Sequence, residues 1–305
     1  MARMSRRSLL INSGLTAAGA AAVAAGAVSP PAQATPQHRR PPITPVYVEV
    51  NNCHLSSVGQ YALAGSGGNV FDIGIIFAAN INAGTGGRQA QLFCNPQVQA
   101  TLDDADNQIR PLQAKGIKVL LSILGNHQGI GLANLTDRAS AEDFARQLAD
   151  IVTQYDLDGI DFDDEYADYG VDGTPQPNAY SFVHLVSALR RLLPEKIISL
   201  YDIGPASTAL SYHGVKVGDL IDYSWNPYYG SWMVPEVPGL TRSELGPAAI
   251  AINSTPTSTA FSLAERTLHK GYGVYLTYNL PDEDSHEYLS SFTRALHGRD
   301  AVYLG

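Results

Sequence analysis

The sequence predicts a single irregular (β/α)8 barrel of the α/β class, and three observations support this prediction. Eight short apolar or alternating runs recur along the chain, helix-like segments separate several of them, and residues 45–305 have the length of one large domain. Such an alternation is typical of parallel strands with helices outside them. The runs expected to be strands are 46–50, 71–79, 118–124, 159–165, 197–202, 223–228, 248–252 and 274–278.

The segments between the strands divide into helices and loops. Apolar residues recur at helical spacing in four of these segments. The expected helices are 96–115, 140–155, 178–193 and a shorter one, 263–270. The stretches 204–219 and 230–247, after the fifth and sixth strands, contain Gly, Pro and Ser instead. We therefore expect loops to replace the outer helices at these two positions.

The first 34 residues have the pattern of an export signal rather than of a folded segment. Arg6 and Arg7 form a twin-arginine pair, an Ala- and Gly-rich apolar stretch follows, and small residues end the segment at Ala34. The alternative is a membrane-spanning anchor, which would be richer in leucine. Residues 35–44 are predicted to be a disordered leader and 45–305 the barrel domain. The protein is expected to be secreted by the twin-arginine route.

Charge and composition narrow the range of partners. The formal net charge of −9 becomes −12 when the signal and its three arginines are removed. Such an acidic chain disfavours nucleic acid and anionic membranes as partners. A neutral ligand such as a sugar is compatible with it, and the sixteen tyrosines include candidates for stacking on sugar rings. We expect a monomer that needs no cofactor.

Cysteine and histidine give no sign of a metal site. Cys53 and Cys94 each follow a strand-like run, and in an exported protein such a pair suggests a disulfide. Two unpaired thiols are the equally open alternative. The eight histidines are scattered and show no zinc-like spacing.

The most informative stretch is Asp158-Gly-Ile-Asp-Phe-Asp-Asp-Glu165. Because a strand has a period of two, Asp161, Asp163 and Glu165 project from one face, about 7 Å apart per step. Acids on a buried face are costly unless they are paired, hydrogen-bonded or used in chemistry. Their mutual repulsion should raise the pKa of at least one of them, which would provide a general acid near neutral pH.

Two other interpretations of this stretch were considered. It could be a solvated acidic turn or a calcium loop, but the alternating Ile160 and Phe162 argue against the calcium loop. In a barrel, chemistry lies where strands end, which is where Asp163 and Glu165 fall. Asp158, at the start of the strand, is expected to be structural, and Asp164 to face away or into a loop.

The stretch also resembles the D-x-x-D-x-D-x-E signature of glycoside hydrolase family 18. Three flanking stretches, 118–129, 222–230 and 271–279, resemble the endo-β-N-acetylglucosaminidases of that family, in unbroken order from about Tyr47 to the C-terminus. The resemblance implies a barrel fold and a glycosidase activity. It further implies cleavage of the N,N'-diacetylchitobiose core of high-mannose or hybrid N-linked glycans on glycoproteins.

The family mechanism implies roles for single residues. Glu165 would be the general acid and then the general base, Asp163 would orient the substrate acetamido group, and Asp161 would share a proton with Asp163. Asn226 and Tyr228 would reach the acetamido carbonyl, unless they merely form a turn at a strand end. The remaining candidates for substrate binding, for each of which packing is as good an explanation, are Phe77, Asn80, Asn126, Tyr201 and Tyr278.

Two alternative functions remain open at this stage. A chitinase-like hydrolase is disfavoured because Ser122-Ile-Leu-Gly125 departs from the chitinase Ser-x-Gly-Gly form, and because the last strand lacks a Trp. A non-catalytic barrel lectin is disfavoured because both Asp163 and Glu165 are present.

Overall fold

The computed structural model describes residues 41–86 and 89–305. The expected export signal and residues 35–40 of the expected leader lie outside the described residues. The chain divides into two compact units, Met1–His38 and Arg39–Gly305, and the fold described below belongs to the second.

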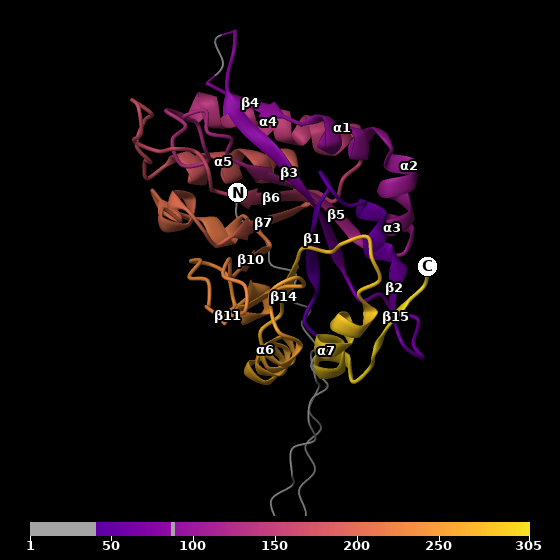
Figure 1. Ribbon diagram of the computed structural model, residues 1–305. Coiled ribbons are helices and arrows are strands. Elements are labelled where there is room, and N and C mark those ends of the chain that lie inside the picture. Colours follow the sequence, from indigo (N-terminus) through magenta and orange to yellow (C-terminus); the bar gives the residue numbers. More distant parts are fainter. Residues whose placement is uncertain (1–40, 87–88) are drawn as a thin grey trace, which may run out of the picture. The chain divides into compact units, whose positions relative to one another are not determined.

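The described residues form a barrel whose wall is a single sheet (Figure 1). Parallel pairing runs in the order β13, β14, β1, β3, β5, β6, β7, β10. The sheet closes because β12 (Leu245–Gly246) pairs with β10, and β13 (Ala248–Ala251), one residue later, pairs with β14. The predicted barrel is therefore confirmed. The other wall strands are β1 (Pro45–Glu49), β3 (Ile73–Ala83), β5 (Lys118–Leu124), β6 (Gly159–Asp163), β7 (Ile197–Tyr201), β10 (Tyr223–Trp225) and β14 (Tyr275–Tyr278).

Two strand boundaries differ from the prediction by three residues or more. β3 continues to Ala83 and turns into the antiparallel strand β4 (Ala90–Phe93), which the polar residues of this stretch concealed. β10 ends at Trp225, because Pro227 has no N–H with which to continue the ladder.

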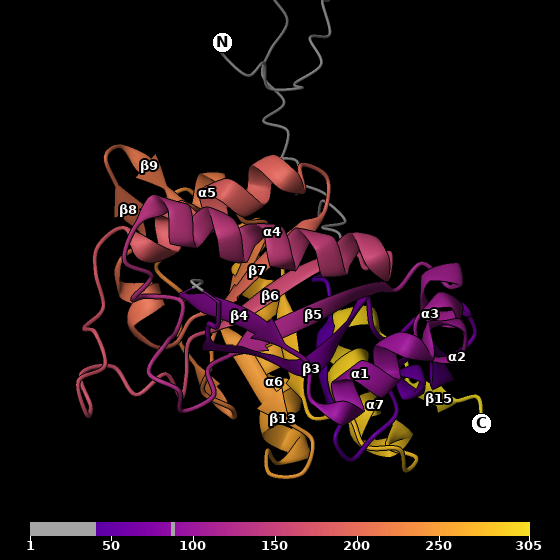
Figure 2. The ribbon, with the colours of Figure 1, turned by 90° about the horizontal axis from the view of Figure 1, so that it is seen from above.

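Helices cover the outside of the barrel. α4 (Arg138–Gln154) and α5 (Ser181–Leu192) lie side by side over one flank (Figure 2), close to their predicted positions. α6 (Thr257–Lys270) begins six residues before the predicted helix, and α7 (His286–His297) was not predicted.

The prediction of one continuous helix over 96–115 was wrong. Three short helices occupy the segment: α1 (Pro96–Asp103), α2 (Ala105–Gln108) and α3 (Arg110–Ala114). Pro111 lies in the first turn of α3, where its missing N–H costs nothing, whereas it would interrupt a longer helix. The same apolar face is nevertheless buried, through Val98, Leu102, Ile109 and Leu112.

The loops expected after the fifth and sixth strands are confirmed. After β7 the chain forms the 3-10 turns η2 (Pro205–Thr208) and η3 (Val217–Asp219) around a small hairpin, β8 (Ser211–Tyr212) and β9 (Val215–Lys216). After β10 it forms β11 (Ser231–Trp232) and the turn η4 (Arg242–Glu244). The first strand is likewise followed by a 3-10 turn, η1 (Leu55–Gln60), rather than an α-helix.

Two residues assigned to the disordered leader belong to the barrel instead. Ile43 forms a parallel bridge with Val274, and its N–H donates to the Gly273 carbonyl at 2.9 Å. Thr44 is fully buried and donates through Oγ1 to the Val70 carbonyl at 2.6 Å. The barrel therefore includes residues that precede the predicted domain boundary.

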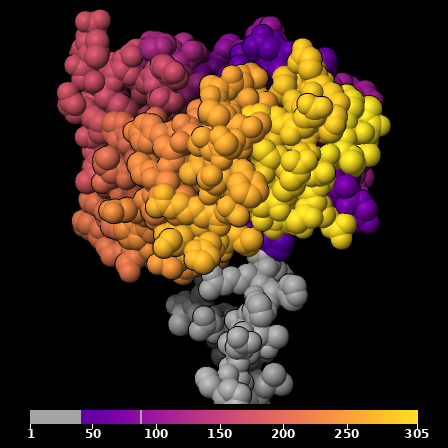
Figure 3. Space-filling model, turned by 60° about the horizontal axis from the view of Figure 1, so that its bottom comes forward, coloured from indigo at the N-terminus to yellow at the C-terminus, as the bar shows by residue number. Residues whose placement is uncertain are grey.

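The C-terminal segment forms a separate two-stranded sheet with a strand from the start of the barrel. β15 (Ala301–Tyr303) pairs antiparallel with β2 (Tyr61–Leu63), and Figure 3 shows these C-terminal residues beside indigo residues from the start of the barrel. Within the described residues, no helix is both long and apolar enough to cross a membrane.

The core has two layers. The larger lies between the strands and the helices. The smaller fills the barrel interior and consists of Tyr47, Ile73, Ile75, Leu120, Tyr201, Trp225, Ala249, Val274 and Leu276. The interior-facing acids of β6 are therefore surrounded largely by apolar side chains.

Candidate active site

Asp161 lies deepest among the interior acids. It is fully buried on β6, and three hydroxyl groups donate to it: Tyr47 at 2.9 Å, Ser122 at 2.8 Å and Ser199 at 2.6 Å. Burial raises its pKa to about 6, although these hydrogen bonds oppose the shift by stabilising the carboxylate. Asp161 is therefore the better stabilised anion of the pair it forms with Asp163.

Asp163 occupies the opposite kind of environment. It is 2% exposed, and its Oδ1 has no hydrogen-bond partner among the described residues. Burial, followed by the charges of Glu165, Asp161 and Asp164, raises its pKa to about 9. Asp163 thus holds a proton at neutral pH and presents an unused oxygen, which suits it to accept a hydrogen bond from a ligand.

Glu165 lies two residues past the end of β6 and is half-buried, so it can contact a ligand. Burial raises its pKa, which favours a protonated acid. Its backbone rests on Gly125, whose N–H donates to the Glu165 carbonyl at 3.1 Å. A side chain at Gly125 would meet that carbonyl oxygen at 2.2 Å, so only glycine permits this approach.

The other two acids of the stretch have structural contacts. Asp158 accepts from Lys118 Nζ at 2.9 Å and from the Val119 N–H at 3.0 Å, as expected of a structural acid at the strand start. Asp164 faces a loop, as expected, but it is buried: it accepts from the Tyr169 hydroxyl at 2.5 Å and from the Ala206 N–H at 2.6 Å. It thereby joins the loops that follow β6 and β7.

Aromatic rings surround the acids. Phe77 packs edge-on against Tyr47 at 5.5 Å and against Tyr278 at 6.0 Å between ring centroids. Tyr278 in turn stacks on Tyr229 at 4.8 Å. The Tyr201 hydroxyl lies 2.8 Å from that of Tyr229. The sequence-predicted residues Phe77, Tyr201 and Tyr278 are thus brought together. With Tyr47 and Tyr229 they form a group of five that we call the aromatic cage.

Three residues of this site were not identified from the sequence. One is the cage residue Tyr47, whose hydroxyl donates to Asp161. Tyr229 adjoins the predicted Tyr228 but, unlike it, turns inward. Glu49, at the end of β1, accepts a hydrogen bond from the Tyr278 hydroxyl. The only sequence signal for Glu49 is its place at the end of β1. Asp163 has the same place at the end of β6.

Asn226 and Tyr228 are placed as in a turn. Asn226 is fully buried; its Nδ2 donates to the Pro247 carbonyl at 2.9 Å, and its Oδ1 accepts from the Tyr228 N–H at 2.8 Å. Tyr228 is 55% exposed. These contacts favour the alternative of a turn at a strand end. In that turn Asn226 fixes the chain that carries the inward-facing Tyr229.

Asn80 and Asn126 also bond to the protein. Asn80 Nδ2 donates to the Gly125 carbonyl at 3.1 Å and Asn126 Nδ2 donates to Asn82 Oδ1 at 2.9 Å. Asn80 therefore supports the loop against which Glu165 rests.

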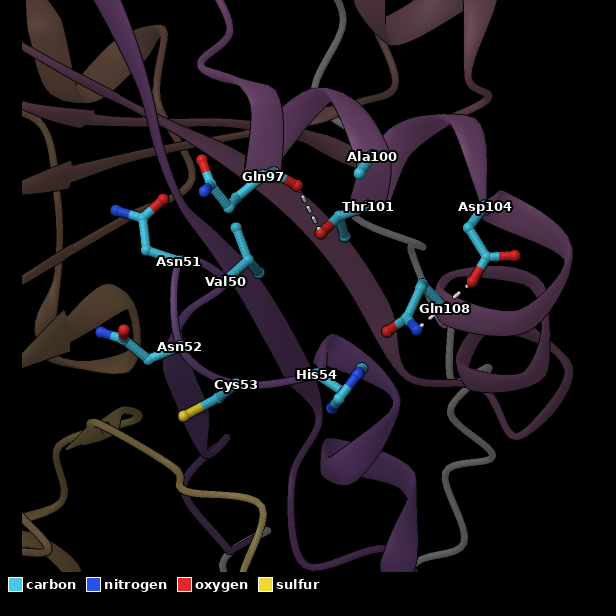
Figure 4. Close-up of a pocket in the computed structure, with 10 residues that line it drawn as sticks. All are labelled: Val50, Asn51, Asn52, Cys53, His54, Gln97, Ala100, Thr101, Asp104 and Gln108. Atoms are coloured by element: carbon cyan, nitrogen blue, oxygen red, sulfur yellow. Dashed lines mark hydrogen bonds between the residues drawn. The ribbon is translucent and has the colours of Figure 1, made fainter.

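A separate cavity of about 420 Å³ lies between the loop after β1 and the helices α1 and α2 (Figure 4). Its lining includes Asn51, Gln97 and Cys53 but none of the β6 acids. Cys53 and Cys94 are both free thiols, so the disulfide alternative is not realised in this structure. Among the described residues, no group of three His, Cys, Asp or Glu side chains could hold a metal ion.

Comparison with known proteins identifies relatives of this chain. The family model "Glycosyl hydrolases family 18" matches residues 79–232. An endo-beta-N-acetylglucosaminidase of Flavobacterium sp. (strain SK1022) is 58% identical over 86% of this chain and 82% of the relative. Endo-beta-N-acetylglucosaminidase F1 of Elizabethkingia meningoseptica is 31% identical over 84% of this chain and 78% of the relative.

Solved structures give a consistent picture. Bacteroides thetaiotamicron EndoBT-3987 with Man5GlcNAc product superposes with a TM-score of 0.77 at 28% identity, over 86% of this chain. This chain spans 62% of the length of that protein. A chitinase from Rhizomucor miehei, with a TM-score of 0.57 and 14% identity, shows the shared fold alone. From the acids of β6, the barrel that holds them and these relatives, we conclude that the chain belongs to glycoside hydrolase family 18 and is a glycoside hydrolase.

Proposed function

We propose that the enzyme is an endo-β-N-acetylglucosaminidase that cuts between the two N-acetylglucosamines of the N-linked glycan core. The observation that carries this proposal is the set of Asp161, Asp163 and Glu165, on and just after β6, in three distinct environments, in a chain that is 58% identical to a named endo-beta-N-acetylglucosaminidase. EndoBT-3987, also similar in structure, was solved with a Man9GlcNAc2Asn substrate. High-mannose and hybrid glycans are the proposed substrates.

The proposed reaction uses the substrate's own acetamido group. All three candidate acids follow one strand, so they do not flank a sugar ring from opposite faces as two separate carboxylates would. The acetamido oxygen therefore attacks the anomeric carbon, while the bond to the leaving oxygen breaks and Glu165 gives that oxygen its proton. An oxazolinium ring forms, and the enzyme remains free of a covalent bond to the sugar.

Asp163 and Asp161 act on the acetamido group as a pair. In the free enzyme they hold a proton at neutral pH, on Asp163. When substrate binds, the proton moves towards Asp161, so that Asp163 accepts the acetamido N–H and its negative charge balances the oxazolinium. Water then attacks the anomeric carbon, Glu165 takes a proton from that water, and the product forms with retention.

We further propose that the protein is exported by the twin-arginine route and acts outside the cell as a monomer. The Arg6–Arg7 pair supports the proposed route of export. Changing both arginines to lysine should keep the protein in the cytoplasm of its host, as measured by fractionation. Unchanged export of that variant would contradict the proposed route.

The activity is tested by incubating the protein with a high-mannose glycoprotein and measuring the intact mass. The proposal predicts a product that retains one N-acetylglucosamine on each cut site. An unchanged mass together with cleavage of chitin oligomers would support the chitinase alternative and contradict the proposed substrate.

A further inference from the structure

Three non-glycine residues with left-handed backbone meet beside Glu165. The φ angles are 53° at His127, 59° at Tyr166 and 55° at Asp168. This conformation is unfavourable for residues with a side chain, especially for a bulky one such as Tyr166. Strain of this kind persists where the surroundings enforce it, and it clusters at functional sites.

Contacts between two loops hold the three residues together. The His127 N–H donates to the Tyr166 carbonyl at 2.7 Å, and His127 Nδ1 lies 2.9 Å from Asp168 Oδ1. The His127 and Tyr166 rings are consequently 5.4 Å apart. The loop after β5 thus holds the His127 ring next to the ring of Tyr166, the residue that follows Glu165.

Packing does not explain why Tyr166 is there. It is 53% exposed, and its hydroxyl has no hydrogen bond within the described part of the chain. The His127 side chain is 65% exposed. The four tyrosines of the aromatic cage are more buried, and the hydroxyl of each of them is hydrogen-bonded. The exposed ring pair therefore has free faces and free polar atoms.

The ring pair follows β5 and β6, two neighbouring wall strands that carry no cage residue and lie between the cage strands β3 and β7. The cage residues come from β1, β3, β7, β14 and the loop after β10, whereas His127 and Tyr166 follow β5 and β6. β6 is separated from β14 by three wall strands in one direction, β1, β3 and β5. Along the chain that leaves β6, Glu165 comes two residues after Asp163, and Tyr166 follows it directly. A glycan whose reacting sugar contacts Asp163 and whose leaving sugar lies beyond Glu165 would therefore reach the ring pair.

From this arrangement we propose that Tyr166 and His127 bind the N-acetylglucosamine on the leaving-group side of the cleaved bond. This inference rests on the proposed function, and it follows from the chemistry of protonation. Glu165 must reach the oxygen that the leaving sugar keeps, so that sugar lies next to the residue that follows Glu165. The apolar face of an aminosugar ring can stack on an exposed tyrosine, and the histidine can hydrogen-bond to its hydroxyl or amide groups.

The test compares two substrates that differ only in the leaving group. One is a high-mannose glycan joined through its chitobiose core to asparagine. The other is a glycosyl fluoride. In it, the reacting N-acetylglucosamine of the same glycan carries fluoride in place of the leaving sugar. Tyr166→Ala should lower kcat/KM by at least about tenfold on the first substrate and leave hydrolysis of the fluoride unchanged. Tyr166→Phe, which keeps the ring face, should restore most of the loss.

Hydrolysis of the fluoride requires a folded enzyme in which Asp163 is correctly placed. Unchanged hydrolysis of this substrate therefore shows that a variant is folded and that its Asp163 is in place. His127→Ala is expected to show the same substrate-selective loss as Tyr166→Ala, though a smaller one. His213→Ala is the matched control, because His213 is also exposed, has a φ of 47° and stacks on Tyr212, but lies in the β8–β9 hairpin.

Three results would overturn the proposal in different ways. Equal activity of Tyr166→Ala and wild type on the glycan would contradict a contact with the leaving sugar. An equal loss on both substrates would instead mean that Tyr166 only positions Glu165 or Asp163. A wild-type enzyme inactive on both substrates would overturn the proposed function itself, and the ring-pair assignment with it.

Discussion

At the scale of single residues, β6 places equivalent side chains in different surroundings. Asp161 accepts from three hydroxyl groups, whereas Asp163, two residues later on the same face, has an oxygen without a partner. Glu165 is the most accessible of the three. Differences in solvation and hydrogen bonding therefore separate their pKa values and their chemical roles.

Glu165→Gln tests the role of the general acid. The amide keeps the size of the side chain but cannot supply a proton, so the rate of hydrolysis should fall by about 10²–10⁴-fold. Glycan binding should persist, because the aromatic cage is unchanged. Rates and binding are measured on the same high-mannose glycopeptide, and full activity of the variant would contradict the assignment.

Asp163→Asn should make the protein more stable, and the gain should depend on pH. Because the folded-state pKa of Asp163 is raised to about 9, wild type must take up a proton on folding at any pH between its unfolded pKa, about 4, and that value. Wild-type stability attributable to this group is thus fully present below pH 4 and is lost as the pH rises towards 9.

The measurement is Tm of wild type and Asp163→Asn between pH 4 and pH 8. The variant should exceed wild type by more at pH 8 than at pH 4, at roughly 2–4 °C for each kcal/mol of stability. A difference in Tm that does not vary with pH would show that the carboxyl is not protonated on folding.

The sequence revealed the β6 acids because strand periodicity alone puts them on one face. It did not reveal Tyr229 or Glu49, whose roles depend on which side of a turn faces inward. It also could not show that the Asn226 amide hydrogen-bonds to the Pro247 carbonyl and the Tyr228 N–H. These bonds depend on how two neighbouring strands are placed.

At the scale of elements, the loop after β5 supports the loop after β6. The Gly125 and His127 N–H groups donate to the carbonyls of Glu165 and Tyr166 at 3.1 and 2.7 Å. These two hydrogen bonds join the two loops. The position of Glu165 therefore depends on the loop that follows the neighbouring strand, β5.

Gly125→Ala tests this support. Its Cβ would lie 2.2 Å from the Glu165 carbonyl oxygen, so the loops must separate at a cost of about 1–3 kcal/mol. We expect a lower Tm and a larger loss in kcat than in substrate affinity. Gly68→Ala is the control, because its nearest neighbour would be a flexible side-chain atom at 3.6 Å. Equal effects of the two changes would contradict a specific role for Gly125.

Element prediction succeeded for long periodic segments and failed where one residue outweighs the pattern. α4 and α5 follow strong apolar periodicity, and their ends fall within three residues of the prediction. The segment 96–115 has the same periodicity, but α1 already ends at Asp103, and Pro111 is compatible only with the first turn of the last helix, α3. The β3–β4 hairpin was missed because the end of β3 and the whole of β4 are more polar than the rest of the wall.

At the scale of the whole molecule, one interrupted strand segment closes the barrel. Leu245 and Gly246 pair with β10, Pro247 interrupts the ladder, and residues 248–251 pair with β14. The eightfold repeat was predictable because each strand contributes a local signal. How the sheet closes was not, because it depends on long-range pairing.

The N-terminal boundary of the barrel can be tested by truncation. A chain beginning at Pro41 keeps Ile43 and Thr44, whose bonds to Gly273 and Val70 fasten the first strand. It should show the Tm and activity of the chain that begins at Thr35. A chain beginning at Pro45 loses these bonds, each contributing about 0.5–1.5 kcal/mol, and should melt at a lower temperature. Equal Tm values for all three would contradict this boundary.

The central claim is that the substrate's acetamido group is the nucleophile and that Asp163 and Glu165 serve it from one strand. The most direct test is to follow cleavage of a chitobiose-linked glycan by proton NMR and identify the anomer that forms first. Substrate assistance predicts the β-anomer, with the α-anomer arising later by mutarotation. Initial formation of the α-anomer would mean direct attack by water and would contradict the proposed mechanism.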